Sequence, residues 1–302
     1  MDTEELKELI RFDDSGNIFV DGVNITPALT NILSAGKLEH VDSPYASHDG
    51  AAGMRELKSL IFKLEYSAAL AEVFKSNLSE EFLNMDGMST EKVRHYLNNA
   101  CSSVEFSSGT KNYLEVGCAS GSTYISSNFK SNLDRSYVCD IFTEEKCGAN
   151  GKDDFINNCQ KYLGHPPKNL INEDCFSLDL SSFTEKINLY LFDGPHEVND
   201  HRKALTYFEE IFDDTVVVFI DDWNDDRVQL GTLLGLSEIE YDVAFWRYDP
   251  ANLQIAPFGV VPAIRKPIKL SGIGATRGYS LDFGDQHRWT NGFMTMILRK
   301  RK

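Results

Sequence analysis

The chain has 302 residues, of which 42% are hydrophobic and 25% charged, enough for one large α/β domain with an extension or for two small domains. Its formal net charge of −16 repels phosphate backbones, so DNA and RNA are poor candidates for a substrate. No stretch approaches the roughly 20 apolar residues of a membrane span, and the polar start MDTEELKELI lacks the apolar core of a signal peptide, so no membrane partner is expected.

The first 50 residues differ in pattern from the rest of the chain. Residues 12–26 are predicted to form a hairpin, because Ser15-Gly16-Asn17 supplies a turn and the apolar residues after it alternate with polar neighbours. A polar connector bearing Gly, Ser and Pro follows at residues 40–52. These features predict a small N-terminal extension over residues 1–50 and a main domain over residues 51–302.

Two helices are predicted next. Apolar residues recur at helical spacing between about 53 and 77, which indicates an amphipathic helix. Ser89-Thr90-Glu91 then opens a second helix, in which Thr90 is suited to cap the N-terminus.

From residue 112 onward, apolar strand-like runs alternate with helical stretches. Such alternation, with strands apolar along their whole length, is typical of a parallel sheet covered by helices on both faces. Two late strand candidates and a long Gly/Pro/Asp-rich stretch at 249–291, expected to hold functional loops, complete the pattern. The sequence therefore predicts an α/β fold with a doubly wound, mostly parallel sheet of seven strands, at 112–116, 136–141, 169–171, 187–192, 216–220, 241–247 and 292–299, and intervening helices at 122–130, 151–163, 198–212 and 226–236.

The six cysteines form no CxxC pair, and several fall inside apolar runs. Buried free thiols in a reducing compartment fit this pattern better than a disulfide framework or a zinc site. A cytoplasmic protein is expected.

The strongest local motif follows the first strand of the sheet. Gly117 and Gly121 lie four residues apart, and glycines let a backbone turn sharply and approach a ligand closely. The dinucleotide fingerprint GxGxxG has another spacing. Glu115 would repel a pyrophosphate, whereas it suits a ligand with a positively charged amino-acid end, such as S-adenosylmethionine (SAM). A plain strand–turn–helix with glycines for packing is the alternative that the motif leaves open.

Acids also follow the next two strands. Asp140 lies 23 residues after Gly117, where an acid holds ribose hydroxyls in sheets of this kind. Asp174 follows the third strand and is a candidate contact to an adenine amino group. For either acid, a helix N-cap or a surface charge is the alternative.

Three more carboxylates follow the fourth and fifth strands: Asp193, Asp221 and Asp222. Neighbouring parallel strands would bring them together, where they repel one another strongly. A hard cation such as Mg²⁺ relieves that repulsion and prefers oxygen ligands. The alternative is that Asp222 caps the next helix and that Asp193 lies in a turn with Gly194-Pro195. His196 follows Asp193 by three residues, and an unperturbed pKa of roughly 6.5 suits a catalytic general base.

Three segments occur in the order LEVGCASGST, LYLFDGPHEVNDHRKAL and VVVFIDDWND. They resemble the class I SAM-dependent methyltransferases, and more narrowly the cation-dependent branch that includes macrolide-sugar O-methyltransferases and is related to catechol O-methyltransferase. The similarity covers roughly residues 85–302. It implies a Rossmann-like methyltransferase fold, a magnesium or similar divalent cation held by Asp193, Asp221 and Asp222, His196 as the catalytic base beside Asp193, and SAM held by Glu115, Gly117, Gly121, Thr123 and Asp140. Ser120 in the same loop and Asp174 complete the candidate SAM-binding residues.

The resemblance implies methyl transfer to a hydroxyl of a small molecule or glycan, with a sugar as the favoured acceptor. Three alternatives stay open: a catechol-like acceptor, an NAD-dependent oxidoreductase, and a non-catalytic scaffold with this fold. The first 80 or so residues match nothing in the family, so acceptor binding and contacts in a homo-oligomer are the roles open to them.

Overall fold

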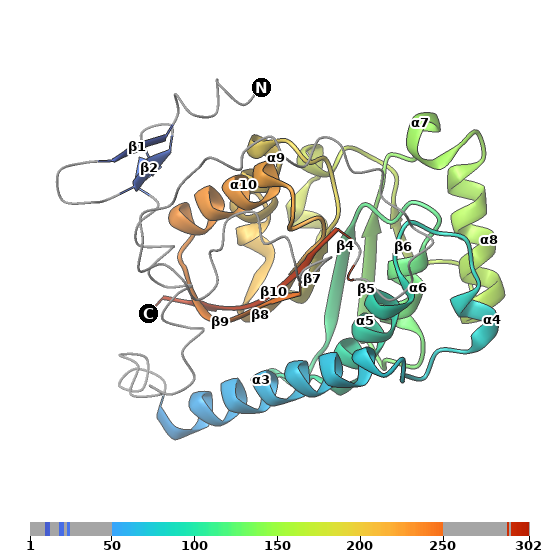
Figure 1. Ribbon diagram of the computed structural model, residues 1–302, viewed down its shortest axis with the longest axis horizontal. Coiled ribbons are helices and arrows are strands. Elements are labelled where there is room, and N and C mark those ends of the chain that lie inside the picture. Colours follow the sequence, from blue (N-terminus) through green and yellow to red (C-terminus); the bar gives the residue numbers. More distant parts are fainter. Residues whose placement is uncertain are drawn as a thin grey trace.

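The dominant feature of the protein is one large sheet. A computed structural model describes residues 10–12, 18–20, 23–24, 50–249, 289 and 291–301. The strands of the large sheet are β4 Asn112–Val116, β5 Arg135–Cys139, β6 Asn169–Ile171, β7 Ile187–Phe192, β8 Phe212–Ile220, β9 Tyr241–Asp249 and β10 Phe293–Lys300. Their order is β6-β5-β4-β7-β8-β10-β9 (Figure 1). Strands β4 to β8 pair in parallel, and β10 is antiparallel to both of its neighbours. The predicted doubly wound, mostly parallel sheet of seven strands is confirmed.

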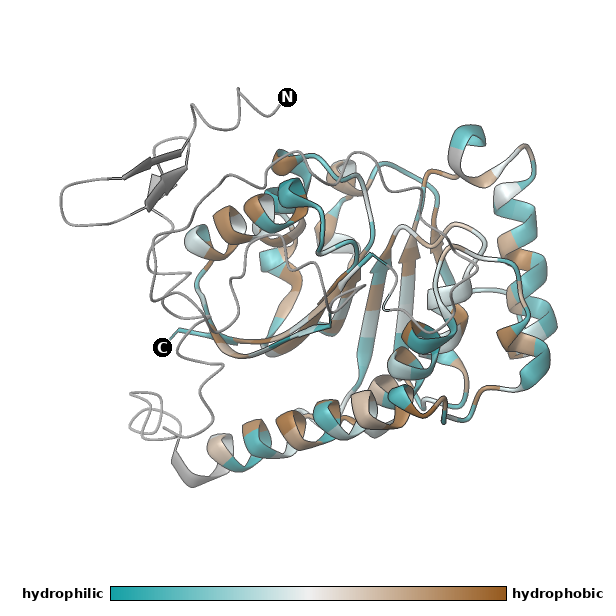
Figure 2. Cartoon of the chain, in the orientation of Figure 1, coloured by the Kyte–Doolittle hydropathy of each residue, from teal (hydrophilic) through white to brown (hydrophobic). Residues whose placement is uncertain are grey.

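Helices cover both faces of this sheet. Figure 1 shows α9 and α10 on the opposite side of the sheet from α3 and α5. In Figure 2, α3 alternates between hydrophobic and hydrophilic turns along its length, as expected of a helix with one buried face. The bounds are α3 Gly50–Glu72, α5 Glu91–Ser103, α6 Ser122–Asn128, α8 Gly151–Leu163, α9 Val198–Thr206 and α10 Asp226–Glu238.

The strands are apolar along their length because each contributes to two cores. In β7, Leu189 and Leu191 pack with residues of α3, α5, α6 and α8. Tyr190 and Phe192, on the other face, pack with residues of α9 and α10. All six residues of β7 are buried, so continuous hydrophobicity replaces the alternation expected of a strand with one solvated face.

The N-terminal region contains three short strands, β1 Ile10–Phe12, β2 Ile18–Val20 and β3 Val23–Asn24. They pair antiparallel in the order β1-β2-β3. The predicted turn Ser15-Gly16-Asn17 falls between β1 and β2, outside the described residues. Residues 25–49 and 250–288 also lie outside them, so the domain boundary and the functional loops at 249–291 stay predictions.

The largest departure from the predicted elements is at the end of α9. The helix was expected to run to residue 212 but ends at Thr206, and a 3₁₀ helix, η4 Phe208–Ile211, leads directly into β8. Phe208 and Ile211 are both buried. The three-residue period of a 3₁₀ helix places them on one side, so the chain reaches the sheet sooner than a longer α-helix would allow.

Four further short helices were not predicted: α4 Glu80–Leu83, α7 Glu144–Cys147, η2 Cys175–Ser177 and η3 Leu180–Ser182. The Thr90 cap on α5 is confirmed, since its side chain accepts the Val93 N–H. All six cysteines are free, and five are buried, Cys147 being partly exposed. Within the described part of the chain, no helix has the length and hydrophobicity of a membrane span.

Candidate active site

The carboxyl ends of five parallel strands meet at one edge of the sheet. Val116 pairs with Cys139 on one side and with Phe192 on the other, and Phe192 pairs with Ile220. From β4 the chain builds outward to β5 and β6, and then returns to add β7 and β8 on the opposite side. The strand order therefore reverses between β4 and β7, and in doubly wound sheets ligands bind beside the carboxyl ends of such a pair of strands.

The loop after β4 depends on its two glycines. Gly117 has a φ of +84°, and a Cβ atom there would lie 1.9 Å from the carbonyl oxygen of Asp193. Gly121 has a φ of +95°, and its Cβ would lie 2.7 Å from the ring of Phe155. Any side chain at either position would meet both an unfavourable backbone and a neighbour. The glycine loop therefore packs directly against the start of the loop after β7.

Glu115 lies in a buried polar network beneath this loop. One of its oxygens accepts the Thr123 hydroxyl at 2.6 Å, and the other accepts the Tyr113 hydroxyl. Ser127 donates in turn to the Tyr113 oxygen at 3.0 Å. Burial raises the pKa of Glu115 to about 8, against the opposing effect of these hydrogen bonds. Glu115 and Thr123, both expected to bind a cofactor, are here bonded to each other and join β4 to α6.

Asp140 holds the glycine loop from the side. One carboxylate oxygen accepts the N–H groups of Cys118 and Ala119, each at 2.9 Å, and the other accepts the Phe142 N–H at 2.6 Å. Ala119 and Phe142 both have positive φ, +44° and +48°. A carboxylate offers about four acceptor positions. Three are taken here, which leaves about one for a ribose hydroxyl.

The remaining cofactor candidates make local contacts. Asp174 accepts the Phe176 N–H at 2.8 Å and caps η2, which is the alternative that the sequence left open. The Ser120 hydroxyl donates to the Asp86 carbonyl at 3.2 Å and ties the glycine loop to the segment before α5.

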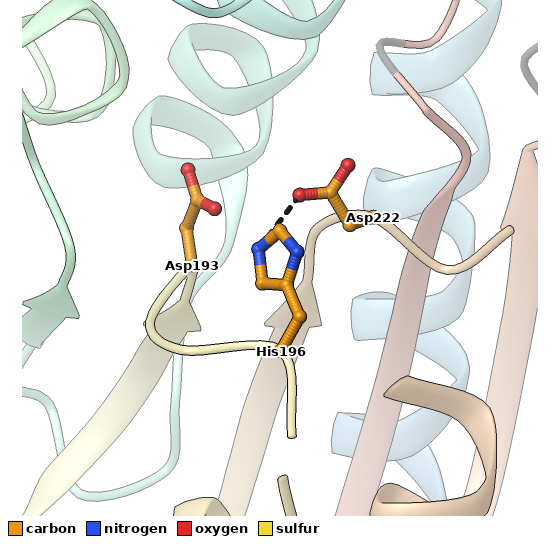
Figure 3. Close-up of side chains that lie close together, drawn as sticks. All are labelled: Asp193, His196 and Asp222. Carbon is orange, nitrogen blue, oxygen red and sulfur yellow. Dashed lines mark ion pairs between the residues drawn. The ribbon is translucent and has the colours of Figure 1, made fainter. Parts of the chain in front are cut away.

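The acids after β7 and β8 converge. Asp193, His196 and Asp222 each offer one ligand atom, and these atoms lie within 4.8 Å of one another. Figure 3 shows the imidazole between the two carboxylates, with its Nε2 2.9 Å from Asp222 Oδ2. Two carboxylates at this distance are the ligand type that a hard divalent cation prefers.

Asp221 takes a different place from the other two acids. It is buried, and one of its oxygens accepts the Asp222 N–H at 2.8 Å. Its carboxylate is outside the group of three ligand atoms. Asp225, rather than Asp222, caps α10, so the capping role considered for Asp222 is wrong.

Burial and neighbouring charges shift the pKa values of residues in and beside this cluster. Burial, followed by repulsion from Asp221 and Asp222, raises the pKa of Asp193 well above its usual range. Burial and the neighbouring Asp222 do the same to the pKa of Asp221. The hydrogen bond to Asp222 raises the pKa of His196, against desolvation. A cation held between these groups would relieve the repulsion that raises the two carboxyl pKa values.

One residue near this cluster was not singled out in the sequence. His201 on α9 is 1% exposed, and its ring centroid is 6.2 Å from that of His196. A signal existed, because His201, Ala204, Leu205 and Phe208 follow the i, i+3, i+4, i+7 spacing of a buried helical face.

The strand order, with antiparallel β10 between β8 and β9, is the Rossmann-like methyltransferase arrangement. No protein-family profile and no curated protein sequence matches the chain. Solved structures with a similar course include an O-methyltransferase from Bacillus cereus in complex with SAH, at 12% identity over 85% of this chain and 96% of that one, with a TM-score of 0.43. The SAH-bound Podospora anserina methyltransferase PaMTH1 is 11% identical over 81% of this chain and 88% of that one, with a TM-score of 0.41. TrmN from Thermus thermophilus is 10% identical over 73% of this chain, with a TM-score of 0.42, and the match spans only 52% of TrmN.

Proposed function

We propose that the protein is a SAM-dependent O-methyltransferase in which a divalent cation, such as Mg²⁺, and His196 activate a hydroxyl of a small, sugar-class acceptor. The observation that carries this proposal is the contact between the two halves of the site. The position of a Cβ on Gly117 is 1.9 Å from the Asp193 carbonyl oxygen. A cofactor on the glycine loop would therefore lie against the acids that would bind the cation.

The charge around the glycine loop favours SAM over a dinucleotide. Asp140 raises the pKa of Glu115, and both Glu115 and Asp140 raise the pKa of Asp193, so this region already disfavours added negative charge. A pyrophosphate would add to that repulsion, whereas a sulfonium and an ammonium group would reduce it. The same argument, with the net charge of −16, disfavours a nucleic-acid acceptor.

Asp193 and Asp222 are the residues that would hold the cation. When bound, the cation supplies Lewis acidity, which lowers the pKa of an acceptor hydroxyl and orients its oxygen. His196 lies beside both carboxylates and is placed to take the hydroxyl proton. A SAM molecule bound here would supply the methyl group: its carbon–sulfur bond would break as the acceptor oxygen bonds to the methyl carbon, which would leave the sulfur neutral.

The sugar class of the acceptor rests on the resemblance to macrolide-sugar O-methyltransferases. Sugars and catechols both offer two neighbouring hydroxyl groups that can bind one cation. A catechol-like phenol is therefore the nearest alternative. The experiment is therefore designed to separate acceptors as well as cofactors.

Calorimetry with SAM and NAD⁺ side by side should show binding of SAM alone. Methyl-labelled SAM with MgCl₂ is then incubated with panels of glycosides and catechols, and mass spectrometry identifies the product that gains a methyl group. Turnover should stop with EDTA and in Asp193→Asn and Asp222→Asn. The matched control is Asp213→Asn, which changes a partly exposed acid near the start of β8, at the other end of the strand from Asp221.

Turnover that persists in EDTA would remove the cation from the proposal. Binding of NAD⁺ rather than SAM would indicate an oxidoreductase. Tight SAM binding without transfer to either panel would indicate a binding module.

A further inference from the structure

The buried imidazole of His201 has no explained role in the fold. Its Nδ1 and Nε2 are both buried and make no hydrogen bond to the described residues. Buried polar groups are almost always paired, and one that is not calls for an explanation. The ring packs edge-on against Phe192, with centroids 5.0 Å apart. Gly231 of α10 lies close to the His201 Cβ.

The charged groups around the ring narrow the choice of a charged partner. Phe192 is apolar, and α10 contacts His201 through the backbone of Gly231. The charged groups that act on His201 are His196, Asp222, Asp225 and Arg227. Asp225 is already bonded to Arg227. His196 and Asp222 therefore remain, and they belong to the proposed active site.

A general base needs a third group to orient its ring. In this structure Asp222 has that place, at 2.9 Å from His196 Nε2. The same carboxylate would also be a ligand of the cation, so it would have to orient His196 and bind the cation at the same time. Burial lowers the pKa of His201 to about 3, so its ring is neutral at physiological pH and offers one acceptor nitrogen.

We propose that His201 is a positioning residue for His196: its unpartnered ring accepts the N–H of His196 when Asp222 is engaged in cation binding. The rings stand 6.2 Å apart between centroids with 55° between their planes, so a turn of the two side chains must bring the nitrogens to about 2.9 Å. This inference rests on the proposed function, because it assigns His201 to the same site.

The first test is spectroscopic and needs no turnover. Protein labelled with ¹⁵N-histidine is titrated with MgCl₂ and followed by long-range ¹H–¹⁵N spectra, with His201→Phe used to assign the His201 signals. One ring nitrogen of His201 should change from a free to a hydrogen-bonded acceptor as the His196 signals respond. His196 signals that respond to Mg²⁺ while those of His201 stay unchanged would overturn the proposal, since Asp222 would then serve both partners.

The second test separates positioning from packing. His201→Phe removes the unpaired nitrogens without opening a cavity and should fold normally in a thermal melt. It should lower kcat by about 10-fold to 100-fold, as loss of a supporting hydrogen bond does, with little change in the KM for SAM. In a His196→Ala background the same substitution should have no further effect. An equal loss in that background, or no loss in the native one, would contradict the proposal.

His95→Phe is the matched control, because His95 is also buried but lies on α5, bonded to Ser76. It should leave kcat unchanged. The two levels of the argument fail in different ways. A His201 response to Mg²⁺ without methyl transfer would refute the proposed function alone, whereas methyl transfer with a silent His201→Phe would refute only this inference.

Discussion

Asp222 combines an unusual backbone with a charged side chain. Its φ is +54°, a region that non-glycine residues seldom occupy. Its carboxylate meets His196 at 2.9 Å, and its N–H is held by Asp221 at 2.8 Å. Such backbone strain persists where the surroundings enforce it, typically at functional sites. Here it directs the carboxylate toward Asp193 and His196.

The role of His196 can be tested at a single residue. His196→Ala should lower kcat by about 10²-fold to 10⁴-fold, because the acceptor proton would have no positioned base. Steady-state kinetics with the acceptor found by the labelling experiment would measure it. His165→Ala, which removes an exposed histidine far from the sheet edge, is the control. A loss below tenfold in His196→Ala would show that His196 is not the base.

Glu115 predicts a pH-dependent stability. With a folded pKa of about 8 against an ordinary value of 4.5, the folded protein keeps a proton that the unfolded chain releases between these pH values. Stability from this residue therefore falls as the pH rises through that window. Glu115→Gln cannot ionise, so its stability relative to wild type should increase from pH 5 to pH 8, by a few kcal/mol at most.

Urea unfolding of both proteins at pH 5 and pH 8 measures this difference. The glutamine amide keeps an acceptor for Thr123 and presents a donor to Tyr113, so the fold should be retained. A stability difference that is independent of pH would mean that Glu115 ionises normally in the folded state.

Among the elements, α9 and α10 make an unusually close contact. A Cβ at Gly231 would lie 2.2 Å from the Val198 carbonyl oxygen, and one at Gly235 would lie 2.8 Å from that of Arg202. Two glycines four residues apart therefore form a groove on α10 that receives the backbone of α9. This contact fixes α9, which carries His201, against α10.

Gly231→Ala tests that contact. In a helix interior this substitution ordinarily stabilises by about 1 kcal/mol. Here the new methyl group meets backbone atoms, and overpacking of this kind typically costs about 1–3 kcal/mol. We expect a net loss of stability in urea unfolding, with a smaller loss for Gly235→Ala, where the contact is longer. Stabilisation by both substitutions would show that the helices separate easily.

The elements that the sequence predicted best are those with the longest apolar signals. The bounds of β4 and β7 agree with the predicted strands because both faces of each are buried and every residue is apolar or part of a buried network. α4 and α7 have four residues each, too few to show a period of 3.6. They were therefore invisible to pattern analysis.

The site was predictable in part for the same reason. Strand ends locate Asp193 and Asp222 without any knowledge of the loops, since parallel strands place their carboxyl ends at one edge. The partners of Asp140 are different. They are backbone N–H groups of Cys118, Ala119 and Phe142, and no sequence period encodes which loop amide meets which carboxylate.

At the scale of the whole molecule, negative charge is in excess, with a net charge of −16, and three of the acids follow the neighbouring strands β7 and β8. The pKa values of Asp193 and Asp221 are well above their usual range. Because proton binding to these carboxyls competes with cation binding, the affinity for the cation should rise with pH.

Thermal melts in MgCl₂ test this expectation. At a cation concentration 100 times Kd, binding to the folded state should add about 2.7 kcal/mol to stability. The increase in Tm at a fixed MgCl₂ concentration should be larger at pH 8 than at pH 6 and absent in Asp193→Asn. An equal increase in that variant would place the cation elsewhere.

The missing side chain at Gly117 has a consequence for how the two ligands act on each other. The glycine loop after β4 and the Asp193 main chain are in direct contact, with no room for an atom between them. A ligand that shifts this contact on one side alters the shape offered on the other. In the proposed function, binding to one half would therefore be linked to binding to the other, and such linkage is reciprocal: a factor by which the cation changed SAM affinity would equally be the factor by which SAM changed cation affinity.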